Sequence, residues 1–373
     1  MDGYSDLTRN ATSAVTPVTV FSYDYEDYFY LEGQNSTPEA PPTLESSRST
    51  SFLLQVLPVG IYSVTCLLGL LGNGLVIAMV TLKMKKSTST VWFLNLALAD
   101  FLFNVFLPLN IAYTAMGYHW AFGRCMCKVN SLLLNLNMYT SVFLLTMISF
   151  DRCVSVVFPV WAQNHRSPKL AWALCALIWA LGFLMSSPSL VFRDVFVKHN
   201  AIACFNNFSL SQSQSDAQLG RTRHLAVTVA RFLAGFVVPL AVITACYLVI
   251  VFRLRRNRLA KSKKPLRIIV ALIVIFFSCW CPYHVFHLLE TQHHLVPPSL
   301  LRVGLPIVTA IAVSNSCMNP VLYVFMGQDF KNFKVAILSR LANALSEETV
   351  HGSLSRRSFT RQYSITEKET TLL

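Results

Sequence analysis

Seven long runs of apolar residues, separated by shorter polar connections, form the dominant pattern along this chain. Each run exceeds the roughly 20 residues that an α-helix needs to cross the hydrocarbon core of a membrane. Five runs carry no charge, while the second contains Asp100 and the third contains Asp151 and Arg152. The pattern predicts an all-α membrane protein, a seven-helix transmembrane domain over residues 52–326. The predicted spans are 52–82, 88–116, about 124–157, 170–192, 232–252, 268–289 and 303–328.

The composition excludes an ordinary soluble domain. Apolar residues make up 54% of the chain and charged residues only 13%, whereas soluble domains carry about 25% charged residues. Ten cysteines lie mostly inside the apolar runs, which is typical of buried small residues rather than of a disulfide framework. Three of them, Cys125, Cys127 and Cys204, fall in polar connections and are candidates for a bridge.

The net charge of +13 reports orientation rather than a nucleic-acid partner. Basic residues collect in the cytoplasmic connections of membrane proteins. The first, third and fifth connections, Arg152 and the tail after residue 328 together hold 21 of the 31 basic residues. We therefore expect a multi-pass plasma-membrane protein whose amino end is outside and whose carboxyl end is inside, which agrees with seven crossings.

The amino-terminal segment 1–51 is predicted to be a disordered, acidic, glycosylated extracellular tail. It holds 8 of the 18 acidic residues. Asn10 and Asn35 lie in glycosylation sequons, as does Asn207 in a later outer connection. Four tyrosines alternate with acids and are candidates for sulfation, namely Tyr23, Tyr25, Tyr28 and Tyr30. The segment is either a plain solvated tail or an anionic surface that attracts a basic protein.

Two further segments are predicted after the last span. Residues 327–342 repeat Phe330, Phe333, Ile337 and Leu341 at helical spacing between basic residues, which indicates a short amphipathic helix on the lipids of the inner leaflet. Residues 343–373 form a Ser/Thr-rich, disordered cytoplasmic tail, either simply solvated or a substrate of kinases. The phosphorylation candidates there are Ser346, Ser353, Ser355, Ser358, Thr360, Ser364 and Thr366.

Several polar residues lie inside the spans, where they need partners. A carboxylate at mid-membrane, surrounded by amide and hydroxyl oxygens, can hold a small hard cation, and sodium is the expected ion. The alternatives are a purely hydrogen-bonded cluster or a proton site. The residues expected to form this cluster are Asp100, Asn137, Ser141, Asn315 and Asn319. No other cofactor is expected.

Charged residues at the outer ends of the spans indicate a binding site. Arg231 lies one residue before the fifth apolar run, and it either snorkels outward or faces the bundle as a partner for a ligand carboxylate. Arg193 in the preceding outer connection adds a second cation. Glu290 is the only acid between residues 217 and 328, and it can pair with Arg231 or with a basic ligand group. The chain lacks the HExxH, GxGD and GxSxG motifs of enzymes, so we do not expect an enzyme.

A set of motifs at characteristic spacing resembles the rhodopsin-like G-protein-coupled receptors over residues 50–340. The matching motifs are GNGLV around Asn73, LALAD ending at Asp100, DRC at 151–153, Trp179, Pro239 with Tyr247, CWCP at 279–282 and NPVLY at 319–323. The resemblance implies a Cys127–Cys204 disulfide, and it leaves open whether Cys125 competes for Cys204. It also implies an activation switch made of Asp151, Arg152, Tyr247, Trp280, Pro282 and Tyr323.

A finer resemblance is to the peptide chemoattractant receptors, carried by SSPSLVFRD, CFNNFSLS and MGQDFKNFKVAILSRL. It implies a protease-trimmed protein ligand whose carboxyl-terminal peptide enters the bundle and meets Arg193, Arg231, Tyr283 and Glu290. The inhibitory class of G protein, arrestin and receptor kinases are the implied inner partners. A lipid carboxylate as agonist and a poorly coupling scavenger receptor stay open as alternatives.

Two departures from the family pattern affect the switch. Cys153 stands where the family usually has tyrosine, and residues 217–289 contain no acid, so an ionic lock from Arg152 to the sixth span cannot form. Asp151 is then the expected nearest partner of Arg152. We expect a modest barrier to activation from this arrangement.

Overall fold

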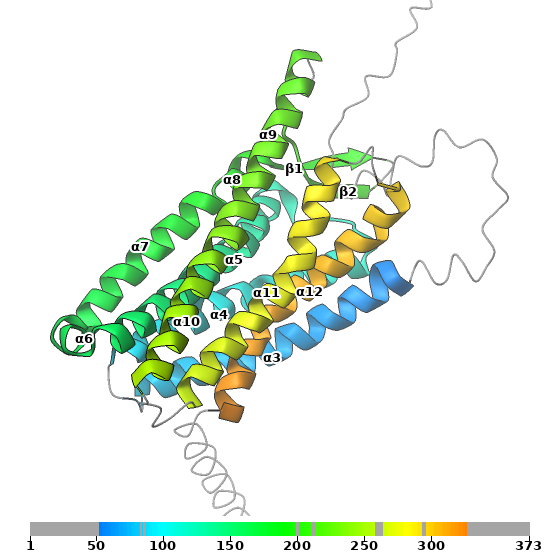
Figure 1. The fold of residues 1–373 in the computed structure, drawn as a ribbon. Helices are drawn as coiled ribbons and strands as arrows, with labels where there is room; N and C mark the ends of the chain where they lie inside the picture. The colour runs from blue at the N-terminus through cyan, green and yellow to red at the C-terminus, as the bar shows by residue number, and fades with distance from the viewer. Residues whose placement is uncertain are drawn as a thin grey trace, which may run out of the picture.

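The computed structural model describes residues 52–82, 84, 87–198, 201–210, 214–257, 264–292 and 296–326. Within these residues the chain forms seven membrane-length apolar helical spans, as predicted, arranged as one bundle (Figure 1). Several predictions lie outside the described residues: glycosylation at Asn10 and Asn35, sulfation of the four tyrosines, the amphipathic helix 327–342 and the phosphorylation sites.

The helical elements follow the predicted spans closely, with one exception. The fifth helix starts far before Phe232, because charged residues mark where the hydrocarbon core begins and do not end a helix. The elements are η1 (Phe52–Val56, π-helical), α3 (Leu57–Leu82), α4 (Thr88–Ala115), α5 (Gly123–Val157), α6 (Pro159–His165), α7 (Pro168–Ser186), α8 (Pro188–Phe192), α9 (Gln214–Phe232), η2 (Leu233–Val237, π-helical), α10 (Val238–Asn257), α11 (Lys264–Thr291) and α12 (Pro298–Met326).

Local sequence signals set where two of these helices begin. Ser87 caps α4 through a capping box, in which its hydroxyl accepts from the Thr90 N–H and the Thr90 hydroxyl accepts from the Ser87 N–H. Ser167 caps α7, and Pro168 occupies its first turn, where no N–H is needed. Both caps satisfy backbone donors that would otherwise lack partners next to the membrane.

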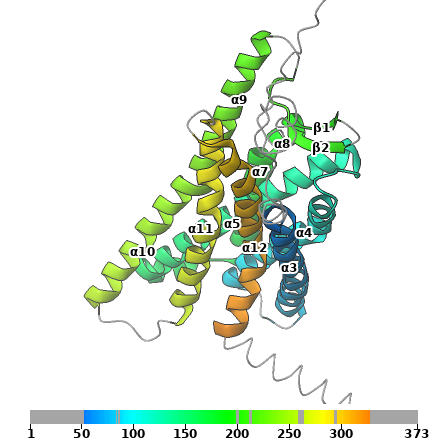
Figure 2. The ribbon, with the colours of Figure 1, turned by 90° about the vertical axis from the view of Figure 1, so that its right-hand side faces the viewer.

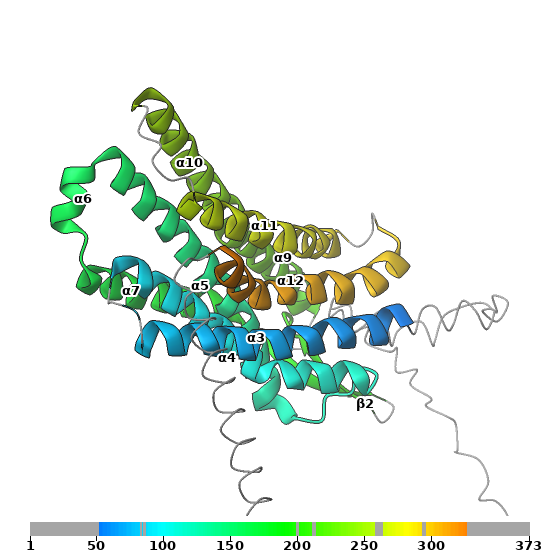
Figure 3. The ribbon, with the colours of Figure 1, turned by 90° about the horizontal axis from the view of Figure 1, so that it is seen from below.

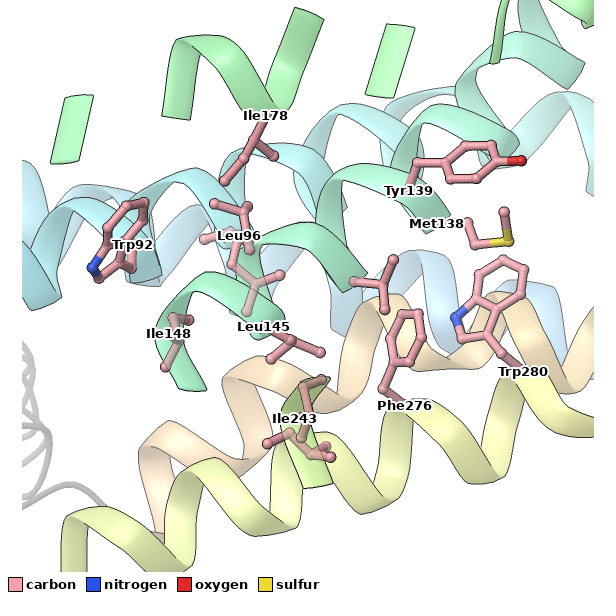
Figure 4. Packing of buried hydrophobic residues seen from close by; sticks show 14 of the residues in the cluster. Trp92, Leu96, Met138, Tyr139, Leu145, Ile148, Ile178, Ile243, Phe276 and Trp280 are labelled. Atoms are coloured by element: carbon pink, nitrogen blue, oxygen red, sulfur yellow. The ribbon is translucent and has the colours of Figure 1, made fainter. Parts of the chain in front are cut away.

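Helix α5 is the central element of the bundle. It packs against α4, α7, α10 and α11, and α3 packs against α4 and α12; Figure 3 shows α3 running beside these two helices. The core of buried side chains comes largely from the helices around α5 (Figure 4), and the residues labelled there include Trp92, Met138, Leu145, Phe276 and Trp280. Large apolar residues such as Leu71 and Leu248 stay 66% exposed, as expected for surfaces that face lipid.

A two-stranded antiparallel hairpin, which the sequence did not predict, joins α8 to α9. Its strands are β1 (Arg193–Lys198) and β2 (Ala201–Asn206), and Val195 pairs with Cys204. The hairpin and the start of α9 lie at the same end of the bundle (Figures 1 and 2). The Trp120 N–H donates to the Ile202 carbonyl at 2.7 Å, which ties the hairpin to the connection between α4 and α5.

We predict that Gly72→Ala destabilises the protein. A Cβ at Gly72 of α3 would lie 2.7 Å from the Pro320 side chain of α12, and a ring held within a helix has little room to move. Overpacking of this kind costs about 1–3 kcal/mol, measurable as a lower melting temperature in detergent. Gly60→Ala on the same helix is the control, since no heavy atom lies within 4 Å of its added Cβ. Equal melting temperatures for the two variants would contradict the predicted contact.

Candidate functional site

A cavity opens at the hairpin end of the bundle, which is the extracellular end by the distribution of basic residues. Its wall includes two arginines, Arg193 and Arg231, together with Asn130, Tyr283 and His287. It also includes side chains from α3, α4, α8, β2 and α12, so the cavity brings together segments that are distant in the chain.

Arg231 lies at the end of α9 and lines this cavity rather than only the lipid surface. Its Nη1 donates to the Tyr283 hydroxyl of α11 at 3.3 Å. Arg193, the first residue of β1, donates from Nε to the Ser131 hydroxyl of α5 at 2.5 Å. The structure thus places the two sequence-predicted cations in the lining of one cavity, and in these two contacts each donates to a neutral hydroxyl.

Glu290 is buried on α11, where it contacts His287, a residue of the site that the sequence reasoning missed. Its Oε2 lies 2.8 Å from Nδ1 of His287, one helical turn earlier. The His287 ring stands edge-on to Tyr283, with ring centroids 4.3 Å apart. Arg231, Tyr283 and His287 therefore line the cavity, and the buried Glu290 is linked to them through His287. The spacing of three residues between His287 and Glu290 was the available sequence signal.

Neutral polar groups line further parts of the cavity, and sequence reasoning also missed them. Asn110 of α4 and Asn130 of α5 exchange two amide hydrogen bonds of 3.0 Å. Asn135 of α5 donates to the Ser189 hydroxyl of α8 at 3.0 Å. All four residues line the cavity. Nothing in the local pattern marks such pairs, because each is made between helices.

The hairpin that carries Arg193 is fixed to the outer end of α5. The structure contains the Cys127–Cys204 disulfide, with 5.7 Å between the Cα atoms. An ion pair of 2.7 Å between Arg124 and Asp194 adds a second link. Cys125 is an exposed free thiol, so in this structure it does not compete with Cys127 for Cys204. Asn207, the described glycosylation candidate, follows β2 on this same outer side, and its Oδ1 accepts from the Leu210 N–H.

A second polar cluster lies at mid-membrane around Asp100, which is fully buried. Its Oδ1 accepts from Asn137 Nδ2 at 2.8 Å and its Oδ2 accepts from Asn319 Nδ2 at 2.6 Å. These contacts join α4, α5 and α12. Among the described residues, Ser141 Oγ and Asn315 Oδ1 are buried oxygens with no hydrogen-bond partner. Ser141 follows Asn137 by four residues and Asn315 precedes Asn319 by four, so each lies about one helical turn from an amide that donates to Asp100. Unused oxygens at these positions fit the donor set expected for a hard cation.

Trp280 connects the outer cavity to the core. It lies two residues before Pro282, the proline inside α11, and its side chain is only 1% exposed. Its ring contacts Tyr283 toward the cavity, at 5.2 Å between centroids, and Phe276 toward the inner side, at 5.9 Å. A displacement of Tyr283 therefore reaches the core through packed aromatic rings, and Figure 4 shows two of them, Trp280 and Phe276.

At the inner end of α5 the structure corrects one expectation. Asp151 pairs with Arg166 and not with its neighbour Arg152: Arg166 Nε and Nη2 lie 2.6 and 2.7 Å from the two carboxylate oxygens. Arg152 instead donates to the Ser89 hydroxyl of α4 at 2.5 Å. Tyr247 of α10 is partly buried, with no hydrogen-bond partner for its hydroxyl among the described residues. Tyr323 belongs to α12.

Comparison with known proteins agrees with these features. The sequence model of the protein family described as "7 transmembrane receptor (rhodopsin family)" matches residues 72–323 of this chain. Chemerin-like receptor 1 of Bos taurus is 61% identical over 330 residues, covering 86% of this chain and 91% of the relative. The human protein of that name is 58% identical over 344 residues, or 90% of each chain. The C3a anaphylatoxin chemotactic receptor of Oncorhynchus mykiss is 41% identical over 296 residues, covering 79% of this chain and 80% of the relative.

We predict that Cys127→Ser and Cys125→Ser have different effects on stability. Losing a native disulfide costs about 2–5 kcal/mol, so Cys127→Ser should lower the melting temperature and weaken any ligand binding to the outer cavity. Cys125→Ser should leave both unchanged, because Cys125 is an exposed free thiol. Melting curves of both variants in detergent test the assignment, and destabilisation by Cys125→Ser alone would reverse it.

Proposed function

This chain belongs to the rhodopsin family of seven-transmembrane receptors, and from that premise we propose that its ligand is the carboxyl-terminal peptide of a chemerin-like protein. The chain is a multi-pass membrane receptor of the chemoattractant group and not an enzyme. We further propose that agonist binding is transmitted to an inhibitory-class G protein, with receptor kinases and arrestin acting on the phosphorylated tail.

The two arginines in one outer cavity are the observation that carries this proposal. A guanidinium group offers several donors in a planar fork that matches a carboxylate in two-point geometry. Arg231 comes from α9 and Arg193 from β1, and both line the cavity, so a terminal carboxylate and the adjacent peptide carbonyls have donors from two elements. Tyr283 and the His287–Glu290 pair provide the polar contacts beside them.

Transmission follows from the packing below the cavity. A ligand group that moves Arg231 or Tyr283 shifts Trp280 against Phe276, and Pro282 allows α11 to bend there because its ring removes a backbone hydrogen bond. An agonist favours the arrangement in which the inner half of α11 moves outward. Arg152, Tyr247 and Tyr323 are then the residues proposed to line the inner cavity for the G protein.

Two alternatives keep a specific basis. The same guanidinium groups suit a lipid carboxylate as agonist. The substitution of Cys153 for the usual tyrosine favours a scavenger receptor that binds ligand but couples poorly. Agonist-stimulated nucleotide exchange separates signalling from scavenging, and competition between the peptide and a fatty acid separates the ligands.

We predict that Arg231→Ala reduces the potency of the chemerin carboxyl-terminal peptide by at least tenfold. Truncating one partner of a buried charge pair costs about 2–5 kcal/mol. Amidating the peptide should weaken binding to the wild type but have little further effect on Arg231→Ala. Arg221→Ala is the matched control, since Arg221 lies exposed on the same helix and outside the cavity wall. Nucleotide-exchange and binding assays measure potency and affinity. If Arg231→Ala reduced the potency of the free-acid and the amidated peptide by the same factor, the carboxylate contact would be contradicted.

We also propose a sodium site at the Asp100 cluster. Asp100, Asn137, Ser141, Asn315 and Asn319 would hold the ion, and the unpartnered oxygens of Ser141 and Asn315 support this assignment. When bound, the ion supplies a positive charge beside the buried carboxylate and favours the inactive helix arrangement. Since coupling between two sites is reciprocal, agonist and sodium should weaken each other's binding.

Asp100→Asn is therefore expected to abolish the sodium sensitivity of agonist binding. Allosteric couplings are typically about 5–150-fold, so agonist affinity in sodium chloride should fall below that in choline chloride of equal ionic strength for the wild type only. Asp194→Asn serves as control, because this acid lies on the outer hairpin. A sodium effect that persists in Asp100→Asn removes the proposed site.

A further inference from the structure

Asp151 at the inner end of α5 is paired with Arg166, which is not one of the residues expected to form the activation switch. Arg166, the residue that follows α6, places Nε 2.6 Å from Oδ1 and Nη2 2.7 Å from Oδ2 of Asp151. The carboxylate side chain is only 8% exposed and the arginine side chain 28%. This two-point pair occupies both oxygens of Asp151, and such charge-assisted bonds are about twice as strong as neutral ones.

Arg152, the next residue, is held much more weakly. It donates from Nη2 to the Ser89 hydroxyl at 2.5 Å, and its buried Nε has no hydrogen-bond partner among the described residues. Residues 217–289, which include α10 and most of α11, contain no acid that could pair with Arg152. The guanidinium that we propose to face the G protein therefore donates here to a neutral hydroxyl, while Asp151 lies close enough to act on its charge.

Removing Arg166 would change the partner of Asp151. A carboxylate with so little exposure is costly to leave unpaired, and Arg152 is the adjacent cation on the same helix. Asp151 would then draw Arg152 away from Ser89 into a charge-assisted pair. Ser89 lies close to both arginines, since Arg166 Nη2 is 3.4 Å from the same hydroxyl, so the rearrangement needs only short side-chain movements.

We propose that Arg166 is a positioning residue for G-protein coupling: by occupying Asp151, it keeps Arg152 available to the G protein. The proposal deepens the proposed function and rests on its G-protein coupling. The change in activity expected on removing Arg166 is opposite to the change expected on removing an ionic lock. Loss of a restraint on the inactive state raises agonist-independent activity, whereas loss of Arg166 should lower both basal and agonist-stimulated activity.

The test compares four variants with the wild type in nucleotide-exchange assays with a purified inhibitory-class G protein. Arg166→Ala should reduce basal and stimulated exchange by about tenfold, since hydrogen bonds to charged groups are strong, while peptide binding without G protein stays unchanged. Arg166→Lys should keep part of the activity, because an ammonium offers the charge without the two-point geometry. The double variant Asp151→Asn/Arg166→Ala should recover exchange, since the amide no longer competes for Arg152. Lys169→Ala, an exposed change in the first turn of α7, is the control.

Recovery in the double variant separates positioning from a merely structural role. A loop that Arg166 only holds in place would not be restored by a second substitution. Unchanged or increased exchange in Arg166→Ala, or no recovery in the double variant, overturns the proposal. Should Arg166→Ala fail to fold, Arg166→Gln carries the same expectations, because it keeps polarity without charge. If the wild-type receptor drives no nucleotide exchange, basal or stimulated, the proposed G-protein coupling is overturned. If exchange occurs but the peptide does not stimulate it, only the proposed ligand fails, and the role of Arg166 is tested from the basal rates.

Discussion

The need to satisfy polar groups where no water can reach them is the constraint on which this structure depends. Asp100 lies fully buried at mid-membrane and accepts hydrogen bonds from Asn137 and Asn319. Because its partners come from α5 and α12, one carboxylate on α4 fixes three helices relative to one another. An apolar residue there would pack as well against lipid-like neighbours, but it would specify no single arrangement. The polar cluster thus gives the bundle a defined state that a ligand can shift.

The outer and inner ends use charge in different ways. At the outer end the cations of the cavity donate to neutral hydroxyls, those of Tyr283 and Ser131. At the inner end Arg166 pairs with the Asp151 carboxylate, whereas Arg152 donates to the Ser89 hydroxyl. Each end therefore holds a guanidinium against a neutral hydroxyl, and Trp280 and the central helix α5 lie between them.

The sequence predicted what depends on local pattern, and it did not predict what depends on contacts between distant segments. The seven spans, the motifs around Asp100 and the outer arginines are readable because hydrophobicity and charge are local. The start of α9 at Gln214 was missed because helix length and membrane thickness are separate quantities. The hairpin, the Asn110–Asn130 amide pair and the Asp151–Arg166 pair were missed because each forms only when non-adjacent segments meet. The expected pairing of Asp151 with Arg152 was wrong for the same reason, since adjacency in sequence does not rank partners.

The attachment of the β1–β2 hairpin has a consequence for how ligands differ in effect. Arg193 sits on a hairpin that the Cys127–Cys204 bond joins covalently to α5, so this cation moves only with the central helix. Arg231 is the last residue but one of α9, which leads into the π-helical turn η2 and packs against α11. In the proposed complex, a ligand that contacts both groups therefore responds to the distance between them. Two compounds of equal affinity can then differ in efficacy when one fits the narrower and the other the wider gap, so the length of the ligand's last residue matters as much as its charge.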